Sequence, residues 1–250
     1  MNKSTSWGKV ASWYNTLLET DQNSYQRKLI LPNLIRLLEI KKDEVIIDLA
    51  CGQGFFAREC AKLGAKVIGV DISSELIEFA KQDKSVEYHV SEANKLDFLH
   101  NESVDKILII LSLQNIENVQ DVIKEANRVL KPKGQLFIVL NHPAFRIPKD
   151  SSWGWDETKK KQYRRLDGYM SETSEQIQMH PGDKPWEKTT SFHRPLQFYF
   201  KTLSKNGLSV TRLEEWVSHK ISEEGPKKIA EDKARHEFPL FLFIEANKTC

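Results

Sequence analysis

The chain has 250 residues, of which 40% are hydrophobic and 29% are charged, and its formal net charge at pH 7 is +2. This length and composition predict one globular domain with a sizeable core. The near-neutral charge gives no electrostatic reason to expect nucleic acid or an anionic membrane as a partner.

Two segments near the N-terminus have the apolar spacing of amphipathic helices. They are residues 7–19 and residues 25–38, although Pro32 fits poorly inside the second. We therefore expect residues 1–40 to form an N-terminal helical cap on the main domain.

From residue 45 to residue 140, short apolar strands alternate with helices. The apolar runs are of strand length, and the segments between them carry one apolar face or a capping residue. Such alternation predicts a parallel α/β sheet with helices on both faces. The expected strands are 45–49, 67–71, 86–90, 104–113 and 135–140; the expected helices are 55–63, 73–82 and 119–130; and 131–134 is expected to be a turn.

The pattern breaks after the fifth expected strand. Residues 141–191 are polar, basic and rich in Trp and Tyr, and they predict an insertion that forms a lid over the substrate. A helix at 196–205 and two strands at 208–217 and 238–246 follow. Because the charged segment between these strands has no ordinary helical pattern, we expect them to pair antiparallel. We interpret 1–250 as a single domain.

The N-terminus and the cysteines are typical of a cytoplasmic protein. Residues 1–7 lack the apolar core of a signal peptide, and the longest apolar stretch, Ile107–Leu113, is too short to span a bilayer. Cys51, Cys60 and Cys250 have no zinc-ligand spacing and cannot all pair with one another. We therefore expect reduced thiols and no bound metal.

The first expected strand ends in an acid and a glycine-containing loop. Asp48 is followed by Ala50, Gly52 and Gly54. Ligands of open α/β sheets bind at the carboxyl ends of the strands, and glycines let the backbone approach a ligand closely. The second strand ends in Asp71, whose carboxylate is suited to the two hydroxyls of a ribose. These residues predict a nucleoside-containing ligand.

The same loop also satisfies the dinucleotide pattern G-x-G-x-x-G/A, so an NAD(P)-dependent oxidoreductase is one interpretation. A dinucleotide brings a pyrophosphate, which favours a helix N-terminus without a carboxylate beside it. S-adenosylmethionine (SAM) brings a sulfonium and an ammonium instead, and Asp48 would attract both. The charge of the loop therefore favours SAM.

Three motifs stand together in this chain: Asp48-Leu49-Ala50-Cys51-Gly52-Gln53-Gly54, Gly69-Val70-Asp71-Ile72-Ser73 and Leu130-Lys131-Pro132-Lys133-Gly134. With them the chain resembles the class I SAM-dependent methyltransferases, most of all the C-methyltransferases of ubiquinone and menaquinone biosynthesis. The resemblance covers about residues 38–140 and implies a Rossmann-like sheet of seven strands. It implies methyl transfer from SAM to a small-molecule acceptor, with a non-catalytic SAM-binding protein as a further alternative.

The resemblance also implies roles for individual residues. Asp48 would face the methionine amino group, and Asp71 would bind the ribose hydroxyls. Ala50 departs from the family, which more often has Gly at this position. The remaining implied contacts are Gly52 and Gly54 with the methionine moiety, Ile72, Glu92 and Ala93 with the adenine, and Leu111 with the sulfonium side.

The insertion is the expected acceptor side. Its aromatic and basic residues suit a planar or apolar molecule that carries a carboxylate or phenolate. They are Trp153, Trp155, Tyr163, Tyr169 and Trp186, with Arg146, Arg164 and Arg165. The sequence after the fourth strand, residues 112–116, lacks the Asn-Pro-Pro-Tyr type of motif of nucleic-acid amine methyltransferases. This argues against a nucleic-acid acceptor.

Two histidines are candidate catalytic bases. His142 directly follows the fifth strand, and His193 precedes the helix after the insertion. A neutral imidazole could take the proton of an acceptor hydroxyl or acidic carbon as the methyl group arrives.

Overall fold

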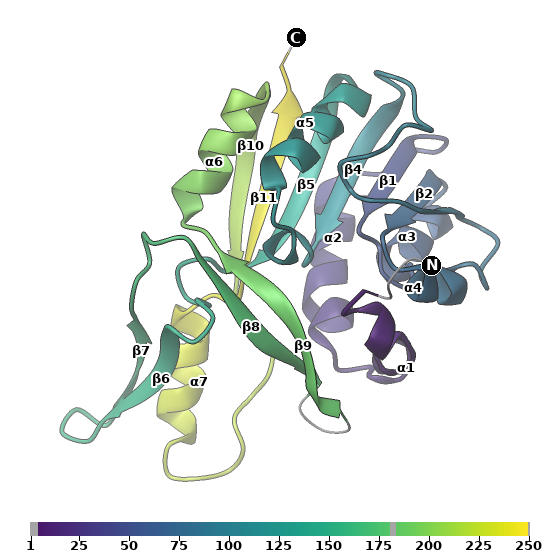
Figure 1. Cartoon of the computed structure of the whole chain (residues 1–250). Coiled ribbons are helices and arrows are strands. Elements are labelled where there is room, and N and C mark those ends of the chain that lie inside the picture. Colours follow the sequence, from purple (N-terminus) through teal and green to yellow (C-terminus); the bar gives the residue numbers. More distant parts are fainter. Residues whose placement is uncertain (1–4, 181–183, 250) are drawn as a thin grey trace.

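The computed structural model describes residues 5–180 and 184–249, so Cys250 and the first four residues of the N-terminal segment lie outside the described residues. A seven-stranded sheet forms its centre (Figure 1). In spatial order the strands are β10 (Leu208–Trp216), β11 (Phe241–Lys248), β5 (Leu130–Asn141), β4 (Val104–Ile110), β1 (Val45–Leu49), β2 (Lys66–Asp71) and β3 (Glu87–Val90).

The pairing of the strands confirms the predicted Rossmann-like sheet. Strands β1 to β5 are parallel, and β11 lies antiparallel between β5 and β10. The chain proceeds from β1 to β2 and β3 on one side, then returns to β4 and β5 on the other. The order therefore reverses between β1 and β4, and their carboxyl ends frame the crevice where ligands of such sheets bind.

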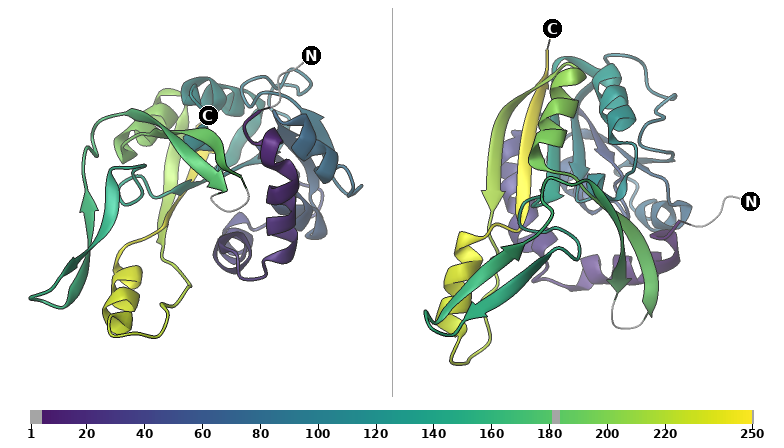
Figure 2. Two further views of the ribbon diagram at one scale, coloured as in Figure 1. Left: turned by 60° about the horizontal axis from the view of Figure 1, so that its bottom comes forward. Right: turned by 60° about the vertical axis from the view of Figure 1, so that its left-hand side comes forward.

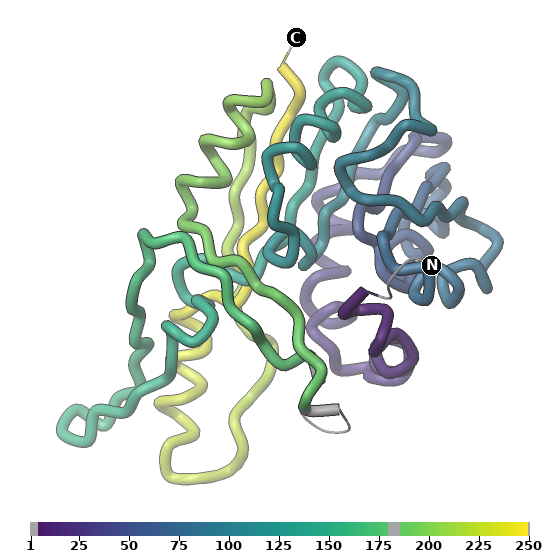
Figure 3. Tube along the Cα trace, in the orientation of Figure 1, coloured from purple at the N-terminus to yellow at the C-terminus, as the bar shows by residue number. Residues whose placement is uncertain are grey.

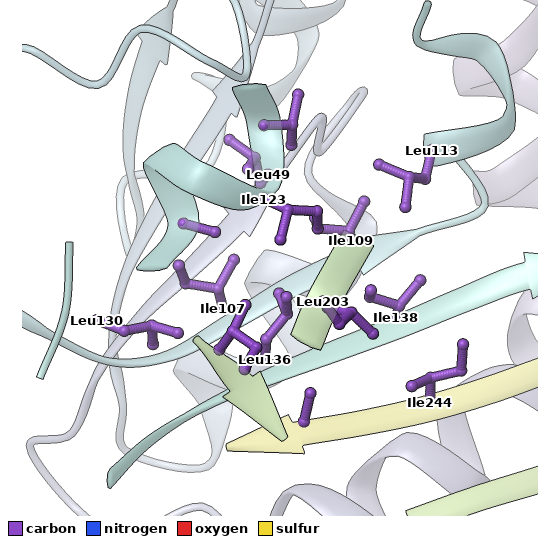
Figure 4. Close-up of a cluster of buried hydrophobic side chains, with 14 of the residues drawn as sticks. Leu49, Ile107, Ile109, Leu113, Ile123, Leu130, Leu136, Ile138, Leu203 and Ile244 are labelled. Atoms are coloured by element: carbon purple, nitrogen blue, oxygen red, sulfur yellow. The ribbon is translucent and has the colours of Figure 1, made fainter. Parts of the chain in front are cut away.

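Helices cover both faces of the sheet because its buried strands are apolar on both faces. One face packs on α5 (Val119–Val129) and α6 (Leu196–Lys205), and Figure 4 shows Ile123 and Leu203 of these helices against Ile107 and Ile138 of the sheet. The other face packs on α2 (Leu31–Leu38), α3 (Phe55–Lys62) and α4 (Ser74–Ala80). Each fully buried Leu or Ile contributes about 1.5–3 kcal/mol of burial free energy.

The N-terminal segment forms helices where they are expected, in more pieces than expected. A 3-10 turn (η1, Gly8–Val10) precedes α1 (Ala11–Thr20), and a π-helical turn (η2, Gln26–Ile30) precedes α2. Pro32 lies just after this π-helical turn, and the backbone stays helical without a break from residue 25 to residue 38. The chain thus accommodates Pro32 by a local change from π-helical to α-helical hydrogen bonding inside the expected helix.

The segment 131–134, expected to be a turn, instead lies inside β5. Val104 of β4 pairs with Leu130, and the next pair is Lys106 with Gln135, so the four residues between bulge out of a continuous strand. Lys131 Nζ bonds Asp105 Oδ1 at 2.7 Å and ties the bulge to β4. The expectation of a separate turn is therefore wrong in detail.

Residues between β5 and α6 form two hairpins that the sequence did not predict. They are β6 (Ser151–Asp156) with β7 (Lys161–Leu166), and β8 (Thr173–His180) with β9 (Lys184–His193). Figure 3 follows the chain out through both hairpins and back to α6, and Figure 2 shows the hairpins beyond the carboxyl end of β5. A further unpredicted helix, α7 (Lys228–Glu237), packs against β7. Among residues 5–180 and 184–249, no helix is both long and apolar enough to cross a membrane.

Candidate functional site

A cavity of about 560 Å³ lies at the carboxyl ends of β1, β2 and β4. These strands converge there because they are parallel neighbours. The structure brings all of the predicted cofactor residues except Gly54 to this cavity. They are Asp48, Ala50, Gly52, Asp71, Ile72, Glu92, Ala93 and Leu111.

The two glycines of the loop have different surroundings. Gly52 lines the cavity with φ +58°, and a Cβ there would lie 3.4 Å from Cε1 of Tyr14. Gly54 has φ +82° and precedes the first residue of α3. A Cβ on Gly54 would lie 2.3 Å from the Tyr88 hydroxyl, so this glycine lets the loop pack on a protein side chain.

Asp71 holds the loop in place from the end of β2. Its Oδ2 accepts the N–H of Gly52 at 2.8 Å, and its Oδ1 accepts the N–H of Ser73 at 2.8 Å. Burial raises the pKa of Asp71, and these N–H bonds lower it. Each carboxylate oxygen can accept a second bond, so the group can bind ribose hydroxyls while it anchors the loop.

Asp48 is a buried acid without a full set of partners. The residue is 1% exposed, and its Oδ2 has no hydrogen bond to any described residue. Burial raises the pKa of Asp48 to about 7, the N–H of Ala57 lowers it, and nearby Asp71 raises it. A buried carboxylate oxygen without a donor costs free energy, and a cationic ligand group in the cavity would supply that donor.

Part of the cavity wall is apolar and suits a flat ring. Ile72 is 55% exposed although it directly follows a core strand, and it lines the cavity, as does Ala93. Glu92 also lines the cavity, but its Oε2 pairs with Lys95 Nζ at 2.9 Å. Ile72 and Ala93 can therefore contact an adenine directly, whereas the Glu92 carboxylate already has a partner.

Sequence reasoning missed the residues that cover the cavity. Tyr14 of α1 and Trp7 line it, and their rings meet edge to face with centroids 5.3 Å apart. Ser6 Oγ lies 3.1 Å from Thr189 Oγ1 of β9, and both residues line the cavity. Burial, with Asp71 and then Asp48 nearby, raises the pKa of Tyr14, which therefore stays neutral. The apolar face of the N-terminal helix predicts that this segment packs on the domain, but it does not predict a contact with the cavity.

Ala50 has a left-handed backbone, with φ +60°. This backbone region costs an L-residue about 1–2 kcal/mol of conformational energy. Glycine avoids that cost, but it loses more conformational entropy when the chain folds. We expect Ala50→Gly to raise the free energy of unfolding by about 0.5–1 kcal/mol, measured by chemical denaturation. Ala57→Gly, inside α3, is the matched control and should lower it by about 1 kcal/mol. Equal destabilisation by both substitutions would contradict the strain at Ala50.

Neither candidate histidine lines this cavity. His142 Nε2 lies 2.8 Å from Oε1 of Glu215, and its Nδ1 accepts the N–H of Ala144. Burial lowers the pKa of His142, and the bond to Glu215 raises it. His193 lines a second cavity, where its Nε2 donates to the carbonyl of Tyr169 at 2.8 Å. A role for either histidine as a base stays a prediction.

Comparison with known proteins relates this geometry to a family. Residues 47–138 match a family described as a methyltransferase domain. A demethylmenaquinone methyltransferase of Tropheryma whipplei (strain Twist) is 30% identical over 145 residues, 55% of this chain and 58% of that protein. A ubiquinone biosynthesis O-methyltransferase of Bartonella bacilliformis is 33% identical over 117 residues, 44% of each chain. The chain thus spans about half the length of these curated relatives.

Solved structures share the fold over most of the chain. A Listeria monocytogenes protein assigned as a SAM-dependent methyltransferase has a TM-score of 0.70 and 26% identity, covering 88% of this chain and 97% of that one. A SAM-dependent methyltransferase from Mesorhizobium loti has the same fold, with a TM-score of 0.69, 24% identity and coverage of 87% and 96%. Residues 47–138 thus match a methyltransferase domain, and the chain has the fold of solved SAM-dependent methyltransferases.

Proposed function

We propose that this protein transfers the methyl group of SAM to a small-molecule acceptor. The observation that carries the proposal is the Asp48 carboxylate, which is buried at a glycine loop and has an unpartnered oxygen beside the cavity. An ammonium satisfies that oxygen, whereas the pyrophosphate of NAD(P) would be repelled by it. The oxidoreductase alternative is therefore not favoured.

The side chains around the cavity suit the parts of SAM in turn. Asp48 would hold the ammonium, Asp71 the ribose hydroxyls, and Ile72 with Ala93 the adenine. Leu111, after β4, would lie on the sulfonium side. When bound, SAM supplies a methyl group that its positively charged sulfur activates. The sulfur is the leaving group, and it becomes a neutral thioether when the methyl group is transferred. The protein then contributes alignment and exclusion of water, which can lower the barrier by several kcal/mol.

The acceptor is expected on the side covered by Trp7 and by β9. The curated relatives include enzymes named for demethylmenaquinone and for ubiquinone biosynthesis, which supports an acceptor with an apolar ring. We propose that residues 141–191 form the lid that recognises this acceptor. The position of Thr189 on the cavity wall supports that role.

SAM affinity should depend on pH through Asp48. The pKa of this group is about 7 without cofactor, so below pH 7 the carboxyl holds a proton that the SAM ammonium must displace. We expect the affinity to fall up to about tenfold per pH unit as the pH drops below 7, and to level off above it. Calorimetry between pH 5.5 and 8 measures this. Asp48→Asn should bind SAM weakly with a flat profile; a sloped profile in that variant would contradict the assignment.

Transfer itself can be tested without knowing the acceptor. The protein is incubated with methyl-labelled SAM and fractionated metabolite extracts, and the label is followed into organic products. Incorporation into one small-molecule fraction, absent with Gly52→Val, supports the proposal. SAM binding with no labelled product in any fraction would favour a non-catalytic SAM-binding protein.

A further inference from the structure

A second cavity, of about 420 Å³, lies between the two hairpins and the sheet. Three arginines line it: Arg146, Arg164 and Arg194. No Asp or Glu is among the described residues on its wall. A cavity with three guanidinium groups and no carboxylate attracts anions.

Arg194 is built into this wall. It is 5% exposed, its Nη2 donates to the carbonyl of Glu117 at 2.7 Å, and its Nη1 is buried without a hydrogen bond to a described residue. Its guanidinium lies over the Phe192 ring, 4.9 Å from the centroid. A buried N–H group of a cation without an acceptor is costly, and an anion in the cavity would remove that cost.

Arg164 is fixed in the same cavity. Its Nε donates to the carbonyl of Phe145 at 2.9 Å, its Nη2 donates to Ser151 Oγ at 2.8 Å, and it lies over the Trp153 ring. Burial and then the nearby charge of Arg146 lower its pKa. The positive charges of Arg146 and Arg164 therefore face the same cavity. Among the described residues, none forms a hydrogen bond or an ion pair with the guanidinium of Arg146.

The second cavity is a neighbour of the cofactor cavity. Gln114 lines the second cavity and the next residue, Asn115, lines the first. On β9, Thr189 lines the first and Ser191 the second, and residues two apart on one face of a strand lie about 7 Å apart. An elongated molecule could reach both cavities along this edge.

We propose that the second cavity binds the anionic group of the methyl acceptor, which is an organic anion with an apolar body. The three arginines bind its carboxylate or phosphate, and aromatic residues such as Phe192 and Trp153 contact the apolar part. This inference rests on the proposed function, because the far end of the molecule must meet the methyl group in the cofactor cavity.

Four probes test the chemistry of this site by calorimetry with the SAM-saturated protein: benzoate, phenyl phosphate, inorganic phosphate and neutral benzamide. We expect one or both aromatic anions to bind and benzamide not to bind; which aromatic anion binds more tightly identifies the group. Binding of none, or of inorganic phosphate as tightly as phenyl phosphate, would overturn the proposal. Failure of SAM itself to bind would instead overturn the proposed function.

Arg146→Met tests the arginine whose guanidinium has no hydrogen bond or ion pair with residues 5–180 or 184–249. It should weaken binding of the anionic probe by about tenfold or more, with SAM affinity unchanged. Arg146→Lys should keep part of the affinity. Arg165→Met is the matched control, because Arg165 is exposed, pairs with Asp167 and lies outside the cavity wall. The Arg146→Met protein should unfold at a temperature no lower than wild type. Unchanged probe affinity in it would overturn the assignment.

Discussion

Gly52→Val is expected to abolish SAM binding while the protein stays folded. Gly52 has φ +58°, a region that a β-branched residue strongly avoids. Its Cβ would lie 3.4 Å from the Tyr14 ring, and the rest of the side chain would occupy cofactor space. Titration calorimetry measures the affinity, and circular dichroism checks the fold.

Two controls separate the site from general damage. Gly225→Val places the same side chain at a glycine with nothing within 4 Å, and it should bind SAM as wild type does. Gly52→Ala should bind weakly rather than not at all, because Ala50 shows that this loop tolerates a methyl group at positive φ. Normal SAM binding by Gly52→Val would show that the loop is not the cofactor site.

Asp71→Ala should weaken SAM binding by about ten- to a hundredfold. It removes the acceptor for the ribose hydroxyls, worth about 1.5–3 kcal/mol for a charge-assisted bond. It also leaves the N–H groups of Gly52 and Ser73 without their acceptor. We therefore expect the free energy of unfolding to fall by about 1–3 kcal/mol as well. Calorimetry and chemical denaturation measure the two effects.

The two roles of Asp71 can be separated with a cofactor analogue. A ligand without the ribose hydroxyls cannot form hydrogen bonds to the Asp71 carboxylate. Asp71→Ala should therefore weaken the binding of such a ligand less than it weakens the binding of S-adenosylhomocysteine, which has these hydroxyls. Asp97→Ala, at an exposed acid outside the cavity, should leave both affinities unchanged. Equal losses for both ligands would assign Asp71 to the loop alone.

The sheet was predictable because its signals are local. Ile46 and Ile47 belong to a continuous apolar run, which is typical of a strand buried on both faces. The start of α4 was predictable because Ser73 is a residue type that caps helix N-termini. Asp48 and Asp71 could be found because each ends such a strand. The topology then brings the strand ends together, as it does in any parallel sheet of this order.

The hairpins could not be predicted because they bury polar groups. In β9 the inward residues are Thr189, Ser191 and His193, so the strand lacks the apolar alternation that marks a strand. In α7 only Ala234 is buried, so the sequence of this helix is mostly charged and shows no apolar face. Tyr14 joins the cofactor site through a contact that crosses from α1 to the loop after β1, and no local pattern encodes that contact.

The most direct test of the account is a calorimetric titration of the purified protein with SAM and, separately, with NADH. We predict saturable binding of one SAM per chain, lost in Gly52→Val and weakened below pH 7, and no binding of NADH. Binding of NADH without SAM would contradict the account, because the carboxylate of Asp48 would then lie beside a pyrophosphate.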